Sequence, residues 1–341
     1  MIVLVEVCMK QPKQDIHAQV QSLISAGIIV SDIKEAEDYL SNHVNYYRLS
    51  SYLGLCEYNG QSKKYIKGTS FKHLQELSKL DFALRQIILP MTIDIEFSAK
   101  LEMNYDCSEN SKDDGYSVVS SYLAQDPVLD SKFKSIVQKQ QNTKNVSDEY
   151  GRGILLGHYP DLSVWHMVEL LTMGEFISFW QYYYAAFPKS GLNVTWRNNE
   201  LFQTKKLRNA CAHNNFILPS LTKAPSQANK QLLNNLSKMA QKAGNPFSDS
   251  EKKAIRDSIL LCDVGMLLVF YDEIVISKHL KEKASANLHK FIDERAIENH
   301  TLFDSNPVLV TSYKALKKMI DVIFPLPKTR RCFIQKWIHR D

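Results

Sequence analysis

The sequence predicts an all-α fold, and three observations support this prediction. Apolar residues recur at helical spacing along most of the 341 residues, whereas the alternating pattern of strands is sparse. The chain has no βαβ rhythm, no Gly-rich phosphate loop and no internal repeat. Hydrophobic residues make up 44% of the chain, which is enough for a sizeable core. We therefore expect one helical domain over residues 1–341.

The expected elements follow in chain order. Apolar spacing predicts a helix from Ile16 to Ala26, and Ser31-Asp32 offers N-cap chemistry for a second helix that ends at Leu40. Later helices are expected over 44–55, 71–104, 116–137, 162–187, 193–215, 250–276, 285–294 and 313–324. A turn or short hairpin is expected over 58–68, and loops over 107–114 and 138–157.

Two segments differ from the rest in composition. Residues 1–8 are apolar but lack a basic start and are too short for a signal peptide, so we expect a non-native upstream start or an added strand. Residues 219–250 are rich in Asn, Gln, Lys and Ser, with Pro near both ends. This composition favours a mobile insertion.

Charge and cysteine content narrow the class of protein. The net charge is only +5, which excludes a basic tail that binds DNA through bulk charge but leaves a modest cationic groove open. Six Cys residues occur without a C-x-x-C pair, which argues against a zinc site and a disulfide framework. The longest apolar run, 259–276, contains three acidic residues and so does not predict a membrane span. We expect a cytoplasmic protein without metal or cofactor.

The most informative segment runs from Arg208 to His213, with the sequence RNACAH. Arg208 carries a permanent cation whose planar fork of donors suits a phosphate. His213 is the residue type best suited to move a proton near neutral pH, and Asn209 adds an orienting amide. These are the groups needed to cut RNA without a metal, by attack of the 2′-hydroxyl on the adjacent phosphorus.

The spacing alone is weak evidence, because Arg295 and His300 repeat it, and Arg152 and His158 differ by one residue. On an ideal helix, Asn209 and His213 share a face, whereas Arg208 lies about 140° away from His213. Only the long Arg side chain, a bend or a second subunit brings Arg208 and His213 together. The alternative interpretation is a surface Arg and a helix-end His without function.

An ordered set of short motifs leads up to this hexapeptide. It comprises Ser25 to Ile29, Ala36 to Leu40, Asn45 to Tyr52, Phe71, Leu77, Asp81-Phe82, Leu84-Arg85, Ile95-Glu96, Pro160, Trp165, Glu169, Gly174, Leu207 to Asn209 and Cys211 to His213. In this order the set resembles the Abi (AbiD/AbiF-like) abortive-infection family over roughly residues 10–220. The resemblance places the chain in the HEPN superfamily, whose RNases carry an Arg-to-His motif of this kind.

The resemblance implies a HEPN-like helical bundle with extra N- and C-terminal helices. It also implies an RNase or RNA-binding toxin of bacterial phage defence. Three positions depart from the family pattern. Asn214 and Phe216 stand where family members often carry a second His and an Arg, and Lys100 stands where an Arg commonly follows the acidic residue corresponding to Glu96.

Other residues add candidate roles, each with a structural alternative. Glu169 either pairs with Arg208 and orients its fork, or is a solvated carboxylate. Lys205 and Lys206 flank the motif as candidate phosphate contacts, or form a solvated face. Glu96 and Lys100 fit a structural i,i+4 ion pair. The clusters 46–48 and 182–184 either stack RNA bases or belong to the core.

The leading hypothesis is a metal-independent endoribonuclease toxin, with Arg208, Asn209 and His213 as its catalytic residues. The alternatives are a non-catalytic RNA-binding sensor or regulatory-RNA partner, and a helical protein-interaction scaffold. We expect RNA as the substrate, an RNA or protein that neutralises the toxin, and no membrane partner. Since one His serves two proton transfers poorly, we also expect a homodimer with the site at the subunit junction.

Overall fold

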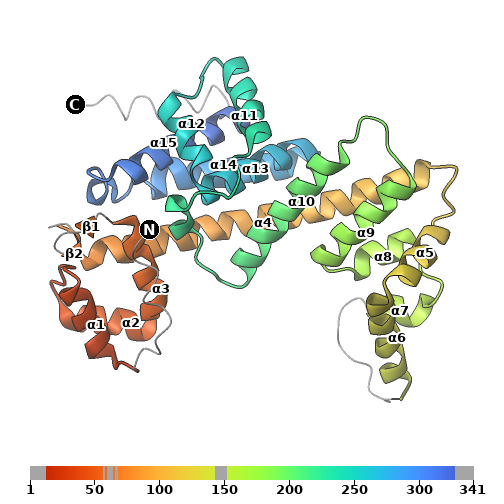
Figure 1. Ribbon diagram of the computed structural model, residues 1–341, viewed down its shortest axis with the longest axis horizontal. Helices are drawn as coiled ribbons and strands as arrows, with labels where there is room; N and C mark the ends of the chain where they lie inside the picture. Colours follow the sequence, from red (N-terminus) through yellow and green to blue (C-terminus); the bar gives the residue numbers. More distant parts are fainter. Residues whose placement is uncertain (1–12, 57, 60–63, 66–67, 143–151, 327–341) are drawn as a thin grey trace. The chain divides into compact units, whose positions relative to one another are not determined.

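The computed structural model describes residues 13–56, 58–59, 64–65, 68–142 and 152–326, and confirms the all-α prediction. Fifteen α-helices and one two-stranded hairpin are formed in this part of the chain (Figure 1). The expected non-native start at 1–8 lies outside the described residues. None of the helices so described combines the length and the apolar character needed to cross a membrane.

The chain divides into two compact units. Unit 1 comprises Met1–Ile87, Asn214–Gly265 and Ser285–Asp341, and unit 2 comprises Ile88–His213 and Met266–Ala284. Three helices belong partly to each unit: α4 (Phe71–Glu109), α13 (Ile259–Ile274) and α14 (Lys278–Lys290). The expectation of a single domain over the whole chain stays a prediction.

The N-terminal helices of unit 1 begin where side chains cap them. These elements are α1 (Ile16–Ser25), α2 (Ile33–Asn42), α3 (Tyr46–Ser51), a 3-10 helix (Tyr52–Leu55) and the hairpin of β1 (Tyr58–Asn59) with β2 (Lys64–Tyr65). Asp15, Asp32 and Asn45 accept backbone N–H groups in the first turns of α1, α2 and α3. Each cap satisfies donors that the helix itself leaves open. The predicted cap at Ser31-Asp32 and the predicted hairpin are confirmed.

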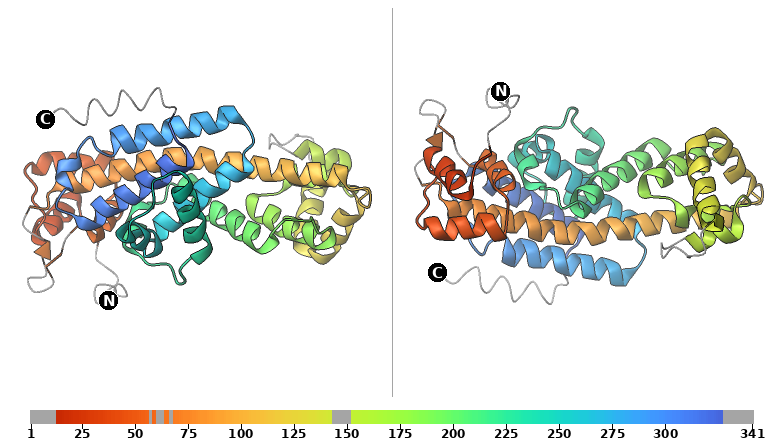
Figure 2. Two further views of the ribbon diagram at one scale, coloured as in Figure 1. Left: turned by 90° about the horizontal axis from the view of Figure 1, so that it is seen from above. Right: turned by 90° about the horizontal axis from the view of Figure 1, so that it is seen from below.

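The rest of unit 1 includes the C-terminal helix α15 (Pro307–Ile323). Its other elements are the 3-10 helix Leu218–Thr222, α11 (Lys230–Lys242), α12 (Asp249–Arg256), the π-helical turn Phe291–Arg295 and the 3-10 helix His300–Leu302. Both α11 and α12 contact α15 (Figure 2), and Leu236, Ile255 and Met319 are buried there. The segment 219–250 therefore contains a helix with a buried apolar face, and its mobility stays a prediction.

Unit 2 contains the long second half of α4 and the helices that follow it. These are α5 (Ser117–Gln125), α6 (Pro127–Asn142), α7 (Arg152–His158), α8 (Val164–Leu170), α9 (Met173–Ala186) and α10 (Val194–Ala212). The loops expected at 107–114 and 138–157 are therefore partly helical. Phe176, Phe179 and Trp180 of α9 are fully buried, and α9 packs on α10 and α5.

Two expected helices are each divided, and capping explains both breaks. The helix expected over 162–187 is α8 and α9, because Thr172 and Glu175 form a capping box that starts a new helix. The helix expected over 250–276 is α12 and α13. Ser248 and Glu251 cap α12 in the same way, and the Ser258 hydroxyl accepts the Leu261 N–H to start α13.

Candidate active site

Helix α10 holds the hexapeptide in unit 2. The Asn193 side chain accepts the Trp196 N–H at 3.0 Å and so begins the helix. Leu201, Leu207 and Cys211 are buried on the side that packs on α9. This packing fixes the rotation of α10 about its axis and thereby decides which motif residues reach solvent.

A buried arginine also anchors α10. Arg197 donates to Glu273 of α13 at 2.7 Å, and its Nη1 lies 3.6 Å from an oxygen of Glu200. Burial raises the pKa of Glu200 to about 8, although the charge of Arg197 opposes this shift. Arg197 therefore ties the first turn of α10 to α13, and the C-terminal turn of α10 carries the motif.

The three motif residues lie at the last turn of α10. His213 is exposed, whereas Arg208 and Asn209 are half-buried. The His213 N–H donates to the Asn209 carbonyl at 3.0 Å, as the i,i+4 spacing requires. Arg208 Nη1 donates to Asn209 Oδ1 at 3.3 Å, so the guanidinium extends towards the face that Asn209 shares with His213. The length of the Arg side chain thus reduces the separation that the helix imposes.

Glu96 of α4, and not Glu169, is the carboxylate beside Arg208. Arg208 Nε lies 3.8 Å from Glu96 Oε2, and Glu96 also forms the predicted ion pair with Lys100 at 3.1 Å. Glu169 is exposed, and no ion pair joins it to Arg208 in the described structure. Of the two interpretations of Glu169, the structure agrees with the solvated carboxylate, and the pairing with Arg208 is not formed in the described structure. Sequence spacing could not reveal the Glu96 contact, because it joins two helices far apart along the chain.

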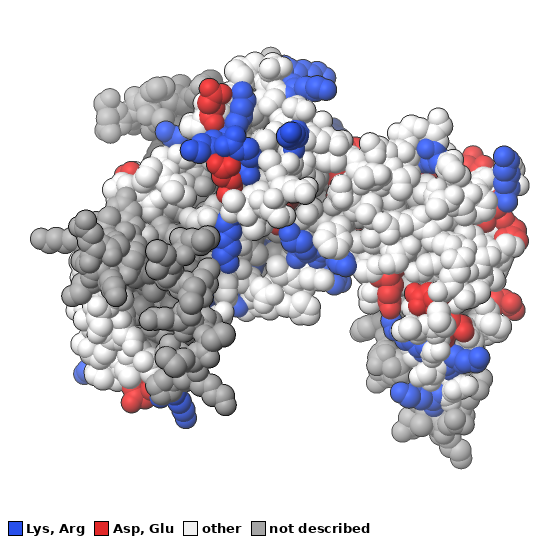
Figure 3. Space-filling model, in the orientation of Figure 1, with Lys and Arg blue, Asp and Glu red and all other residues white. Residues whose placement is uncertain are grey.

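The two flanking lysines have different surroundings. The Lys205 ammonium lies 5.0 Å from the centre of the Phe202 ring, a cation–π contact, and the Lys205 side chain also covers Gly174. Lys206 is exposed and donates to Gln203 at 3.0 Å. On the face that Figure 3 shows, basic side chains are scattered among neutral and acidic ones and form no continuous field. Individual side chains such as Lys205 and Lys206 therefore supply the positive charge next to the motif.

The repeats of the motif spacing have different environments. Arg295 is paired with Glu76 and lies 3.4 Å from Glu298, and His300 lies 3.0 Å from Asp304. His158 is stacked on His166 with ring centres 3.9 Å apart. Carboxylates therefore neutralise both members of the 295–300 pair. In the copy at 208–213, Arg208 also lies near a carboxylate, that of Glu96, but no carboxylate pairs with His213 among the described residues.

The residues after the motif are fixed within unit 1 by a buried carboxylate. Asp81 of α4 is fully buried and accepts the backbone N–H groups of Ile217 and Leu218 at 2.8 and 2.6 Å. The same carboxylate accepts Arg85 Nε at 2.8 Å. Three donors thus satisfy its charge. Arg85 lies four residues from Asp81, but the two backbone partners lie more than 130 residues away, so sequence spacing does not reveal the role of Asp81.

Two arginines hold the residue that follows His213. Asn214 adopts the left-handed backbone conformation, with φ of 56°, in which Asn often ends a helix. Its carbonyl accepts from Arg48, and its side-chain oxygen accepts from Arg85. Arg48 also lies over the Phe216 ring at 5.8 Å. Two of the three departures from the family pattern, Asn214 and Phe216, are therefore held in unit 1 by contacts with Arg48 and Arg85.

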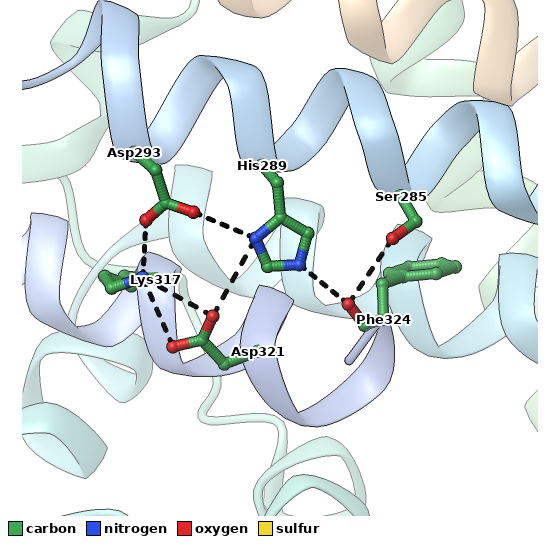
Figure 4. Close-up of polar contacts among 6 residues, drawn as sticks. All are labelled: Ser285, His289, Asp293, Lys317, Asp321 and Phe324. Atoms are coloured by element: carbon green, nitrogen blue, oxygen red, sulfur yellow. Dashed lines mark hydrogen bonds and ion pairs between the residues drawn. The ribbon is translucent and has the colours of Figure 1, made fainter. Parts of the chain in front are cut away.

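A second histidine cluster lies in unit 1 and is closed (Figure 4). His289 is 6% exposed, with Nδ1 3.0 Å from Asp293 and Nε2 2.7 Å from the Phe324 carbonyl. Lys317 lies 2.5 Å from Asp293 and 3.4 Å from Asp321. Both ring nitrogens of His289 are thus engaged. The cluster joins α14 and the π-helical turn to α15.

An apolar pocket of about 430 Å³ also lies in unit 1, lined by side chains such as Leu84, Leu260 and Phe291. None of the predicted site residues lines it. Its polar groups are few, and they include His300 and Asp304, which pair with each other. Among the residues that the structure describes, no group of three or more His, Cys, Asp or Glu could hold a metal ion.

Comparison with known proteins identifies a family to which the chain is similar. A family model described as "Abi-like protein" matches residues 39–218, which is more than half of the chain. The matched segment includes the hexapeptide, Glu96 and the residues that hold Asn214. No curated protein and no solved structure matches the chain.

Proposed function

We propose that this chain, which belongs to the Abi-like protein family, is a metal-independent endoribonuclease of a bacterial abortive-infection system. One observation carries the proposal. His213 is solvent-exposed at the end of α10, on the face that it shares with Asn209, and the Arg208 guanidinium extends to that face. A proton-transfer group, an amide and a permanent cation therefore stand together where a substrate can reach them.

Each group has a step in the reaction. His213 takes the proton of a 2′-hydroxyl, and the freed oxygen attacks the adjacent phosphorus. The P–O5′ bond breaks, a 2′,3′-cyclic phosphate forms, and the leaving 5′-oxygen receives a proton. Arg208 stabilises the charge that builds on the phosphate, and Asn209 orients it. Glu96 positions the guanidinium without touching the substrate.

The reaction needs proton removal and proton donation on opposite sides of the phosphate, and the chain offers one credible motif. We therefore propose a two-fold homodimer in which a second His213 supplies the other group. A surface next to the motif in unit 2 suits such an interface. Ile93, Phe97, Leu101 and Tyr105 form an apolar stripe along α4, and each is more than half exposed.

The opposite face of α4 is also apolar, with Met91, Ile95, Ala99 and Met103 all buried. A helix that is apolar on both faces is usually covered on both. Glu96 and Lys100 immediately precede Phe97 and Leu101, so the carboxylate that holds Arg208 borders the stripe. A second copy seated on the stripe would therefore lie beside both motifs.

Light scattering tests this dimer. Wild-type protein should be a dimer at micromolar concentration, and Phe97→Asp should be a monomer that no longer cuts RNA. Val308→Asp, at a similarly exposed apolar residue outside the stripe, should remain a dimer. A wild-type monomer that cuts RNA would contradict the shared site.

The chemistry has its own test, which uses purified full-length protein and RNA in EDTA. Products should end in cyclic phosphate and 5′-hydroxyl, and a 2′-deoxy group at the scissile position should block cutting. Cutting that requires Mg²⁺, or that proceeds on the deoxy substrate, would show that the mechanism is wrong. RNA retained without cleavage would favour a non-catalytic RNA-binding module, and neither retention nor cleavage would favour a protein-interaction scaffold.

A toxin of this class requires a neutralising partner, either RNA or protein. Expression of the chain alone should therefore slow bacterial growth. Arg208→Ala should relieve this effect, whereas Arg295→Ala, which changes the arginine of the neutralised repeat, should not. Equal growth with the wild-type chain and with Arg208→Ala would count against the toxin.

A further inference from the structure

Unit 1 presents aromatic side chains to solvent beside the segment that follows the motif. Tyr47 of α3 is 76% exposed and Phe82 of α4 is 54% exposed. In the cluster 182–184, by contrast, Tyr183 and Tyr184 are buried core residues. Tyr182 is half-buried, and its ring packs against Tyr122 at 5.2 Å. The two candidate stacking clusters thus differ in burial, and the cluster at 46–48 contains the most exposed ring, that of Tyr47.

The exposed rings stand among guanidinium planes. The Tyr47 and Phe216 rings are 6.1 Å apart, and the Arg48 guanidinium lies 5.8 Å from the Phe216 centre. Arg85 lies 5.7 Å from the centre of the Phe82 ring. Arg48 and Arg85 both donate to Asn214, so the two ring–guanidinium groups meet at one residue.

This arrangement is held rigidly. Asp81 fixes Arg85 and the Ile217 and Leu218 backbone, and Arg85 in turn fixes Asn214. The backbone and the Arg85 guanidinium beside the rings are therefore ordered before a ligand binds, which favours affinity. Arg85 is neutralised by Asp81, whereas no carboxylate pairs with Arg48 among the described residues. Arg48 therefore keeps a net positive charge beside the rings.

We propose that Tyr47, Phe216 and Arg48, with Phe82 beside them, form a docking site for unpaired nucleobases of single-stranded RNA. Aromatic rings and Arg planes stack on bases of any sequence, and Arg48 adds attraction for the phosphates. A duplex cannot use such a site, because its bases are already stacked inside the helix. The inference rests on the proposed ribonuclease function and names the substrate class as single-stranded.

Fluorescence anisotropy with a labelled single-stranded RNA tests the site in full-length protein that carries His213→Ala, so that binding is measured without cutting. Adding Tyr47→Ala should weaken binding about tenfold, the order expected for the loss of one stacked base. Tyr47→Phe keeps the ring and should retain the affinity. Tyr116→Ala removes an exposed tyrosine of unit 2 and should leave the affinity unchanged.

Melting curves control for folding, and Tyr47→Ala should melt with its parent because the residue is so exposed. Unchanged affinity of Tyr47→Ala, or tighter binding of duplex than of single strand, would overturn the docking site. The exposed rings would then serve another contact, such as a protein. If wild-type protein cuts RNA while Tyr47→Ala binds normally, only this inference fails. If the wild-type protein neither binds nor cuts RNA, the proposed function fails as well.

Discussion

His213 and His289 are the same residue type in opposite environments. His289 is buried, and both of its ring nitrogens have oxygen partners (Figure 4). His213 is exposed, and no side chain in the described structure bonds its ring. A histidine whose nitrogens are engaged holds helices together but has no nitrogen left for a substrate proton. Of the two histidines, His213 is therefore the one whose ring nitrogens are available to the proposed substrate.

The largest expected effect concerns the closed cluster. Asp293→Ala removes the carboxylate that lies against both His289 and Lys317 and leaves two cations with less compensation. Breaking a buried ion pair in this way costs about 3 kcal/mol or more. Urea denaturation should therefore show a large loss of unfolding free energy. His213→Ala should change it by about 0.5 kcal/mol or less, because the residue is exposed.

A similar loss of unfolding free energy in Asp293→Ala and His213→Ala would contradict the contrast between the two histidines. RNA cleavage should show the reverse order, with the larger loss in His213→Ala. Asp293→Ala, assayed well below its melting temperature, should still cut RNA, because the cluster contributes no group to the proposed reaction.

A smaller effect is expected at Glu96, the positioning residue. Glu96→Gln should lower kcat about tenfold with little change in KM, because the held guanidinium acts mainly on the transition-state charge. Glu96→Asp should restore part of the rate. Glu169→Gln is the matched control and should be silent, since Glu169 is exposed and unpaired with Arg208. Equal rate losses at both glutamates would remove the role of Glu96.

The smallest effect is a pH dependence of stability that the closed cluster should produce. Burial by itself would lower the pKa of His289, but its hydrogen bonds to Asp293 and to the Phe324 carbonyl outweigh burial and raise it. Burial by itself would raise the pKa of Asp293, but its contacts with His289 and Lys317 lower it. The His289 contribution is therefore complete below about pH 6.5 and is lost as the pH rises through the raised value.

The Asp293 contribution is complete above about pH 4 and is lost as the pH falls through the lowered value. Both contributions are present together between about pH 4 and 6.5. Urea denaturation at a series of pH values should therefore show that the contribution of the cluster to the unfolding free energy is largest in this range. In His289→Gln, the unfolding free energy should no longer fall as the pH rises above this range. If that variant still shows the same fall in unfolding free energy with rising pH, His289 does not cause the fall.

The sequence predicts local features of this molecule well, and physical reasons explain why. The cap at Asp32 and the course of α10 depend on neighbouring residues, so spacing reveals them. The same holds for the Glu96–Lys100 pair, which lies within one helix. The break at Thr172 was also visible as a capping box, but the apolar pattern that continues through it favoured a single helix.

Contacts between helices could not be predicted in this way. The pairing of Arg208 with Glu96, and of Asp81 with the Ile217 backbone, depends on how helices pack. Periodicity identifies a buried face but not the helix that covers it. The resemblance to the Abi family identified most of these positions without assigning partners to them. The structure adds those partners and thereby replaces Glu169 with Glu96.

The central claim is that the exposed motif, and not its spacing, confers activity. The most direct measurement is the single-turnover rate of RNA cleavage by wild type, His213→Ala and His300→Ala. His300 has the same spacing from an arginine but is paired with Asp304. We expect His213→Ala to lower the cleavage rate at least about 100-fold and His300→Ala to keep the wild-type rate. Wild-type cleavage by folded His213→Ala would contradict it.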